Sequence, residues 1–147
     1  MSIDPALYSS ANTSWETPDD LFAYWDHIFN FDLDVCASPE NTKVADCYFT
    51  EADNGLVQSW GGFHCWMNPP YGAGISLWVQ KAVREAELGA LVCCLLPART
   101  DTRWWQGLIG PHASLIKFLP GRLRFKGAKS SAPFPSAIVV FLPSVVH

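Results

Sequence analysis

At 147 residues the chain can bury one hydrophobic core and is too short for two full domains. No run approaches the ~20 apolar residues of a membrane helix, and the start lacks a signal-peptide pattern, so we expect an intracellular protein without a membrane partner. The five cysteines are an odd set without paired zinc-site spacing, and the four histidines match no ligand pattern, so we expect neither disulfides nor a bound metal.

Charge is distributed unevenly along the chain. Residues 1–96 contain 3 basic and 13 acidic residues, a net charge of −10, whereas residues 97–147 contain 7 basic residues and 1 acidic residue, a net charge of +6. The C-terminal third can therefore attract phosphate groups, although the whole chain has a net charge of −4.

The predicted elements begin with a flexible arm over residues 1–14, followed by a single domain over residues 15–147. Thr17 is the expected N-cap of the first helix, with Pro18 in its first turn. Hydrophobic periodicity then predicts the elements in chain order. They are a helix to Phe29, a strand over 31–37, loops over 38–62, a strand over 63–66, a helix over 74–88, a fully apolar strand over 90–96, a helix over 102–109, a strand over 113–119, and an antiparallel pair over 123–125 and 137–142.

This alternation predicts an α/β fold whose sheet is mostly parallel, with an antiparallel strand pair at the C-terminal end. In such sheets ligands bind beyond the carboxyl ends of the strands. Asp34, Asn68 and Arg99 each follow a predicted strand, so we expect all three at one rim. Alternatively, the side chain of Asp34 caps the turn that follows it.

The sequence Trp66-Met67-Asn68-Pro69-Pro70-Tyr71-Gly72 predicts a stiff loop at the end of a strand, because proline fixes φ and has no N–H. The Asn68 amide and the Pro69 carbonyl offer two acceptors, and Tyr71 offers an aromatic face. That combination suits a planar group with an amine, such as a nucleobase. The alternative is a turn that only ends the strand, with Tyr71 packed on the surface.

A basic stripe is predicted over residues 122–126, where Arg122, Arg124 and Lys126 alternate with Leu123 and Phe125. We expect the stripe to bind phosphates, and the alternative is a solvated strand edge protected by its charge. Further phosphate contacts are expected from Arg99, Arg103 and Lys129, and Phe134 is a second candidate for stacking on a nucleobase.

Five segments together resemble the compact phage-type DNA N6-adenine methyltransferases, the Dam-like group. They are Trp15-Glu16-Thr17-Pro18, Leu33-Asp34-Val35-Cys36-Ala37, Trp66 to Gly72, Leu95-Leu96-Pro97-Ala98-Arg99-Thr100-Asp101-Thr102, and Gly121-Arg122-Leu123-Arg124-Phe125 with Ala132-Pro133-Phe134-Pro135-Ser136-Ala137. The resemblance implies a reduced class I, Rossmann-like methyltransferase fold, S-adenosylmethionine as the donor and adenine in DNA as the acceptor. It also implies action in the cytoplasm of a bacterial host cell, in a phage or prophage setting.

The resemblance assigns roles to individual residues. Asn68, Pro69, Pro70 and Tyr71 fall on the catalytic motif. The residues that fall on donor-binding segments are Trp15, Thr17, Pro18, Asp34 and Cys36, together with Asn68 itself. The carboxylate that holds the donor ribose is expected to be Asp53, with Asp46 or Glu51 as the alternatives, because the usual glycine-rich loop is replaced by Cys36-Ala37-Ser38-Pro39.

We expect the target adenine to leave the duplex and stack on Tyr71, because its amine is inaccessible in paired DNA. Two alternatives stay open. One keeps the chemistry but changes the acceptor to an RNA base or a protein glutamine. The other is a noncatalytic DNA- or nucleotide-binding module on a reduced Rossmann-like scaffold.

Overall fold

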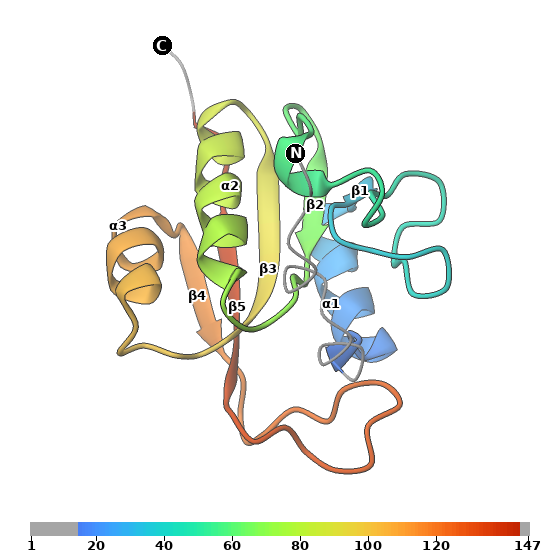
Figure 1. The fold of residues 1–147 in the computed structure, drawn as a ribbon, viewed down its shortest axis with the longest axis vertical. Helices are drawn as coiled ribbons and strands as arrows, with labels where there is room; N and C mark the ends of the chain where they lie inside the picture. Colours follow the sequence, from blue (N-terminus) through green and yellow to red (C-terminus); the bar gives the residue numbers. More distant parts are fainter. Residues whose placement is uncertain (1–14, 145–147) are drawn as a thin grey trace.

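The computed structural model describes residues 15–144, so the predicted arm over 1–14 lies outside the described residues (Figure 1). Helices and strands alternate along the chain as the sequence predicts. The helical elements are α1 (Asp19–Phe29), η3 (Gly55–Val57), α2 (Ile75–Glu87), η4 (Trp105–Ile109) and α3 (Gly110–His112). The strands are β1 (Leu33–Asp34), β2 (His64–Met67), β3 (Leu91–Pro97), β4 (Leu115–Phe118) and β5 (Ser136–Phe141). None of the helices in this part of the chain is long and apolar enough to cross a membrane.

The five strands form one sheet in the order β1-β2-β3-β5-β4. β1, β2 and β3 are parallel, and β5 runs antiparallel between β3 and β4. The predicted α/β fold, with a mostly parallel sheet and antiparallel strands at its C-terminal end, is confirmed.

The predicted pairing of residues 123–125 with the last strand is wrong. β5 pairs with β3 on one side and with β4 on the other. All six residues of β5 are buried, which is the pattern of a central strand with neighbours on both sides. Residues 123–125 form no strand, although the adjacent Lys126 makes an antiparallel bridge with Glu16.

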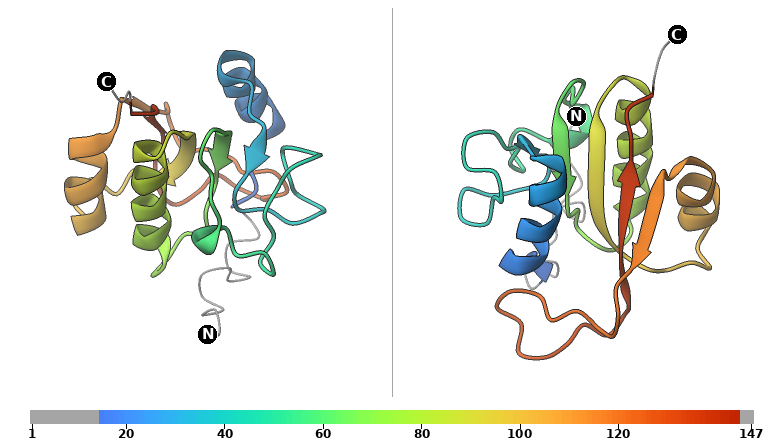
Figure 2. Two further views of the ribbon diagram at one scale, coloured as in Figure 1. Left: turned by 90° about the horizontal axis from the view of Figure 1, so that it is seen from above. Right: turned by 180° about the vertical axis from the view of Figure 1, so that it is seen from behind.

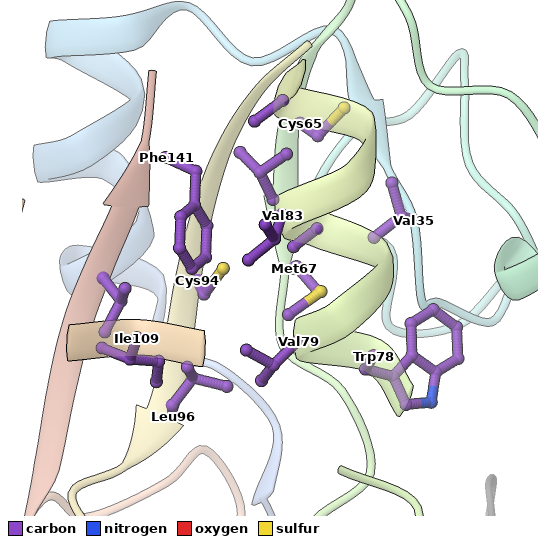
Figure 3. Packing of buried hydrophobic residues seen from close by; sticks show 14 of the residues in the cluster. Val35, Cys65, Met67, Trp78, Val79, Val83, Cys94, Leu96, Ile109 and Phe141 are labelled. Carbon is purple, nitrogen blue, oxygen red and sulfur yellow. The ribbon is translucent and has the colours of Figure 1, made fainter. Parts of the chain in front are cut away.

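One face of the sheet, here called the α2 face, packs against α2 and η4. Alternate side chains of β2, β3 and β5 point into this layer, as Figure 3 shows for Met67, Cys94 and Phe141. Trp78 of α2 and Ile109 of η4 meet them and are fully buried. The α-helix α2 and the π-helix η4 therefore close this face with a continuous apolar core.

The opposite face, here called the α1 face, is covered by α1 and by the irregular segment 123–134 (Figure 2). Trp25 packs on this face from the helix, and Phe125 and Phe134 pack on it from the segment. The segment closes on itself, since the Ala132 N–H donates to the Leu123 carbonyl at 2.8 Å. On this face the aromatic side chains of Phe125 and Phe134 cover the sheet where a second helix would otherwise pack.

Two helix ends differ from the prediction. Pro18, not Thr17, is the N-cap of α1, because the buried Thr17 hydroxyl bonds to Asn68 instead of to the first turn. The helix predicted over 102–109 passes Ile109 and continues through α3, and Pro111 lies near its C-terminal end.

Candidate active site

Asp34, Asn68 and Arg99 lie just at or after the ends of β1, β2 and β3. These strands are parallel, so their carboxyl ends meet at one edge of the sheet. The segment 119–135 leaves β4 at the same edge and extends beyond it (Figure 1). The predicted common rim is therefore present.

A cleft of about 530 Å³ opens at this rim, between the ends of β1 and β2. Asp34 and Cys36 form one side, Asn68 and Pro69 form another, and Trp15 belongs to a third. The remaining lining residues are Glu16, Thr17, Ala37, Ser38, Pro39, Asn41, Lys43, Thr50, Glu51, Ala52, Trp66 and Pro70. The volume lies within the range of pockets that hold small-molecule cofactors.

Asp34 is 3% exposed and lies on the α1 face, because its neighbours Leu33 and Val35 point into the opposite core. Its carboxylate accepts hydrogen bonds from the backbone N–H of Cys36 at 3.3 Å and of Lys43 at 2.9 Å. The bond to Cys36 is the turn cap considered from the sequence. Burial raises the pKa of Asp34 to about 7, although both hydrogen bonds lower it.

The side-chain amide of Asn68 makes three hydrogen bonds. Its Nδ2 donates to the Trp15 carbonyl at 2.7 Å and to the Thr17 hydroxyl at 3.1 Å. Its Oδ1 accepts a hydrogen bond from the Tyr71 hydroxyl at 2.9 Å. The N-terminal wall of the cleft is thus joined directly to the loop after β2.

Pro69 and Pro70 are both buried and both line the cleft. The Pro69 carbonyl accepts no hydrogen bond from any residue between 15 and 144. A carbonyl in that position retains its capacity to accept a hydrogen bond from a ligand.

Tyr71 is half-buried within a cluster of aromatic rings. Its ring contacts Phe125 and Phe134 edge-on, with centroids 6.2 and 5.6 Å away. Trp15 reaches the same two phenylalanines at 5.2 and 5.1 Å. The Tyr71 hydroxyl points inward, within 3.1 Å of the Leu95 carbonyl, and burial raises its pKa well above the usual range. The hydroxyl therefore stays protonated and acts as a hydrogen-bond donor.

The expected donor-binding residues are only partly brought together. Trp15, Thr17, Asp34, Cys36 and Asn68 all line the cleft. Burial raises the pKa of the Cys36 thiol, which leaves it neutral. Pro18 lies next to this group as the N-cap of α1 but does not line the cleft.

The three candidates for the ribose carboxylate lie in different places. Asp53 is exposed outside the cleft lining, and its carboxylate accepts hydrogen bonds from the N–H and hydroxyl of Thr50 at 2.9 and 3.0 Å. Asp46 is exposed and does not line the cleft either. Glu51 does line it.

The predicted alternation of the basic stripe is present. Arg122, Arg124 and Lys126 are exposed, whereas Leu123 is half-buried and Phe125 is 1% exposed. The stripe is not an edge of the sheet, and Lys126 ties it to Glu16 by an antiparallel bridge and to Asp19 by an ion pair. Arg103 and Lys129 are exposed as well.

Arg99 is exposed near the loop after β2, and its guanidinium lies 5.7 Å from the ring centre of Phe134. Phe134 itself is only 7% exposed. Its ring belongs to the aromatic cluster and supports Tyr71 from inside the molecule.

Sequence reasoning missed Lys43, which lines the cleft from the loop after β1. Its amine bonds to Asp19 at 2.8 Å, and its side chain is 10% exposed. Lys43 is the first Lys or Arg in the chain and lies in a stretch that is otherwise acidic. That contrast in charge is the sequence feature that could have indicated a role for Lys43. Among residues 15–144, no three histidine, cysteine or acidic side chains gather as a metal site would need.

Comparison with known proteins gives a consistent result. Residues 6–143 match the family described as DNA N-6-adenine-methyltransferase (Dam). The DNA N-6-adenine-methyltransferase of Haemophilus phage HP1 (strain HP1c1) is 34% identical over 141 residues, which cover 90% of this chain and 80% of that protein. The DNA N-6-adenine-methyltransferase of Escherichia phage T1 is 37% identical over 93 residues, which cover 62% of this chain and 38% of that protein. The resemblance found in the sequence motifs is confirmed, and the chain belongs to the DNA N-6-adenine-methyltransferase (Dam) family.

Proposed function

We propose that this adenine methyltransferase transfers a methyl group from S-adenosylmethionine to the N6 amine of adenine in DNA. The observation that carries the proposal is the position of Asn68 and Pro69 on the wall of the cleft, at the same rim as the buried Asp34. Family membership supports the same reaction. Both relatives come from bacteriophages, which supports the cytoplasm of a bacterial host as the place of action.

The cleft fits a nucleoside donor in size and in chemistry. Trp15, the backbone of Thr17 and the adjoining Pro18 would surround the methionine end, while Asp34 and Cys36 would contact the donor at the tip of β1. A ribose needs an acceptor for its two hydroxyl protons. We assign that role to Glu51, which lines the cleft, because the carboxylate of Asp53 is already bonded to Thr50.

The adenine amine has two N–H groups, and the catalytic loop offers two acceptors for them. The Asn68 Oδ1 and the Pro69 carbonyl would each accept one hydrogen bond, which favours a pyramidal nitrogen with a localised lone pair. Positioning by the stiff Pro69-Pro70 loop, and not a general base, would supply most of the rate. The exposed part of Tyr71 would stack on the flipped base, with Phe134 behind it.

When bound, S-adenosylmethionine would supply an electrophilic methyl group, with the C–S bonding electrons remaining on sulfur as N6 forms the new C–N bond and releases one proton to water. Asn68 and Pro69 would hold the two N–H groups of the amine during attack. The buried Asp34 adds a negative charge near a cationic donor when it is ionised.

DNA would approach the rim from the side of segment 119–135 (Figure 1). Six exposed cations would contact its phosphates. They are Arg99, Arg103, Arg122, Arg124, Lys126 and Lys129.

Transfer of labelled methyl from S-adenosylmethionine to unmethylated duplex DNA, followed by nucleoside analysis, tests the proposal. N6-methyladenine is the expected product. Asn68→Ala should abolish it while donor binding, measured by calorimetry, stays nearly unchanged. Gln80→Ala is the matched control, because it removes an exposed amide from α2 and should leave the activity intact.

Three outcomes would contradict the proposal. An active Asn68→Ala enzyme would remove the catalytic assignment. Donor binding without methylation of DNA would redirect the search to RNA or protein acceptors. A chain that does not bind the donor would favour the noncatalytic module.

The phosphate contacts are tested separately by DNA affinity across a salt series. Arg122→Ala combined with Arg124→Ala should weaken binding and lower the slope against the logarithm of salt concentration by about 2. Arg84→Ala removes an exposed cation from the far end of α2 and should change neither quantity. An unchanged slope in the double variant would exclude these two contacts.

A further inference from the structure

We infer that Thr17 and Tyr71 are positioning residues that fix the orientation of the Asn68 carboxamide, and that the donor cleft and the catalytic acceptor are coupled through residues 15–17. The inference rests on the proposed methyl transfer. It goes beyond that proposal because it assigns to the hydroxyl groups of Thr17 and Tyr71 an action on Asn68.

The orientation of the Asn68 amide decides whether it can serve the reaction. Its oxygen can accept a hydrogen bond from the adenine amine, whereas its nitrogen carries two protons and cannot. The two ends have nearly the same shape, so the loop after β2 alone does not distinguish them. Neighbouring groups must therefore set the orientation.

The Trp15 carbonyl makes this distinction. It lies 2.7 Å from Nδ2 and can only accept a hydrogen bond, so it requires the nitrogen on its side. The reversed amide would place two carbonyl oxygens in contact. The Thr17 hydroxyl, 3.1 Å from Nδ2, accepts the second N–H proton and completes the pairing of the nitrogen. Oδ1 is left facing the opposite direction, toward Tyr71.

Thr17 is well placed for this role because it is 2% exposed. A buried hydroxyl holds its position more firmly than an exposed one, and loss of its bond would leave a partly buried N–H unpaired. Thr17 immediately precedes Pro18, which fixes the backbone before α1.

Tyr71 offers a bond that can be exchanged when substrate arrives. Its single proton lies within reach of two acceptors, the Asn68 Oδ1 at 2.9 Å and the Leu95 carbonyl at 3.1 Å. When the adenine amine donates to Oδ1, the hydroxyl can turn to Leu95 without losing a partner. The Asn68 Oδ1 thus keeps a hydrogen bond from Tyr71 until the adenine amine binds.

The coupling follows from the position of residues 15–17. The same short segment lines the donor cleft and holds the nitrogen of Asn68. A donor packed against Trp15 would therefore restrain the amide in its productive orientation. Binding of the donor would thus prepare the enzyme for the base.

Three variants test the inference: Thr17→Val, which keeps the shape and removes the hydroxyl; Thr17→Ser, which keeps the hydroxyl; and Tyr71→Phe, which keeps the ring. The measurements are the single-turnover rate constant of DNA methylation with saturating S-adenosylmethionine, the dissociation constant of the donor by calorimetry, and the melting temperature. Wild-type enzyme is measured alongside.

Thr17→Val should lower the rate constant by about 10- to 100-fold, because a misoriented amide removes a positioned acceptor, and should change donor affinity by no more than about twofold. Thr17→Ser should recover most of the rate. Tyr71→Phe should lower the rate constant by about tenfold without loss of the aromatic cluster.

Loss of donor affinity in Thr17→Val with a full rate at saturation would make the Thr17 hydroxyl a donor contact and overturn the inference. Equal rates in the Val and Ser variants would overturn it as well. If Thr17→Val does not fold, a wild-type rate in Tyr71→Phe together with a slow Thr17→Ser enzyme would be sufficient to reject it. Wild-type enzyme that binds the donor but leaves DNA unmethylated would refute the proposed function itself.

Discussion

The two faces of the sheet are built in different ways and do different work. The α2 face is covered by α2 and η4, and its side chains form a dry apolar layer. The α1 face is covered by one helix and by the irregular segment 123–134, and it carries Asp34 and the Trp66-to-Tyr71 loop. The helices packed on the α2 face contribute stability, whereas the irregular segment on the α1 face leaves room for a cleft.

The difference follows from strand alternation. Leu33, Val35 and Met67 point into the α2 face, so Asp34 and Trp66 must point the other way. A buried carboxylate needs hydrogen-bond donors such as backbone N–H groups, and the buried Glu85 of α2 accepts one from Trp60. The turn after β1 provides two such groups on the α1 face.

The largest effect is expected from Trp78→Ala on the α2 face. Trp78 is fully buried, and removal of its ring should lower the free energy of unfolding by about 3–5 kcal/mol, since the surrounding helices can close the cavity only in part. Urea unfolding followed by circular dichroism measures the change. Leu77→Ala, at an adjacent position that is 49% exposed, is the control and should cost less than about 1 kcal/mol. Similar losses in both variants would contradict a dry core on this face.

A pH-dependent effect is expected from Asp34 on the α1 face. Its pKa in the folded protein is about 7, well above the usual value for an aspartate, so between these two values the folded state binds a proton that the unfolded state releases. The free energy of unfolding should therefore fall as the pH rises from about 4 to 7, by on the order of 1 kcal/mol per pH unit, and this dependence should end above pH 7.

Asp34→Asn removes the titration and should flatten the pH dependence, which unfolding midpoints between pH 5 and 8 will measure. The same slope in both proteins would show that Asp34 is not the titrating group. Donor affinity should also fall in this variant above pH 7, because the wild-type carboxylate is ionised there.

The smallest expected change in stability gives the most direct comparison of the two faces. Phe125→Leu on the α1 face and Phe141→Leu on the α2 face remove rings that are equally buried, and each should cost about 1 kcal/mol in stability. Only Phe125→Leu should slow methylation, because Phe125 contacts Trp15 and Tyr71. Each variant should be assayed about 20 degrees below its own melting temperature, so that a difference in stability does not affect the comparison of methylation rates. Equal rates would mean that the aromatic cluster only fills space.

Much of the fold could be predicted because its signals are local. The periodicity of α2 and the apolar run of β3 reflect regular packing of a helix on a sheet. The rim followed from a general property of parallel sheets. The Asn68-Pro69-Pro70-Tyr71 loop was recognisable because two prolines leave few conformations to the chain.

The rest depends on contacts between distant segments. Residues 123–125 have the alternation of a strand, and only the position of β5 between β3 and β4 leaves them unpaired. Thr17 has the sequence of an N-cap, and only the arrival of Asn68 redirects its hydroxyl. Glu51 and Asp53 are almost neighbours, and the turn at Thr50 decides which of them lines the cleft.

The carboxylate of Asp19 links three segments next to the cleft. Asp19, at the start of α1, is within 2.8 Å of the Lys43 amine and 3.1 Å of the Lys126 amine. Asp19 thus joins the first helix, the loop after β1 and the basic stripe, which are far apart in the sequence. Exposed ion pairs weaken as ionic strength rises. Added salt should therefore weaken the contacts between these three segments as well as the binding of DNA phosphates. A phosphate that binds Lys126 must compete with the Asp19 carboxylate, which already pairs with that amine.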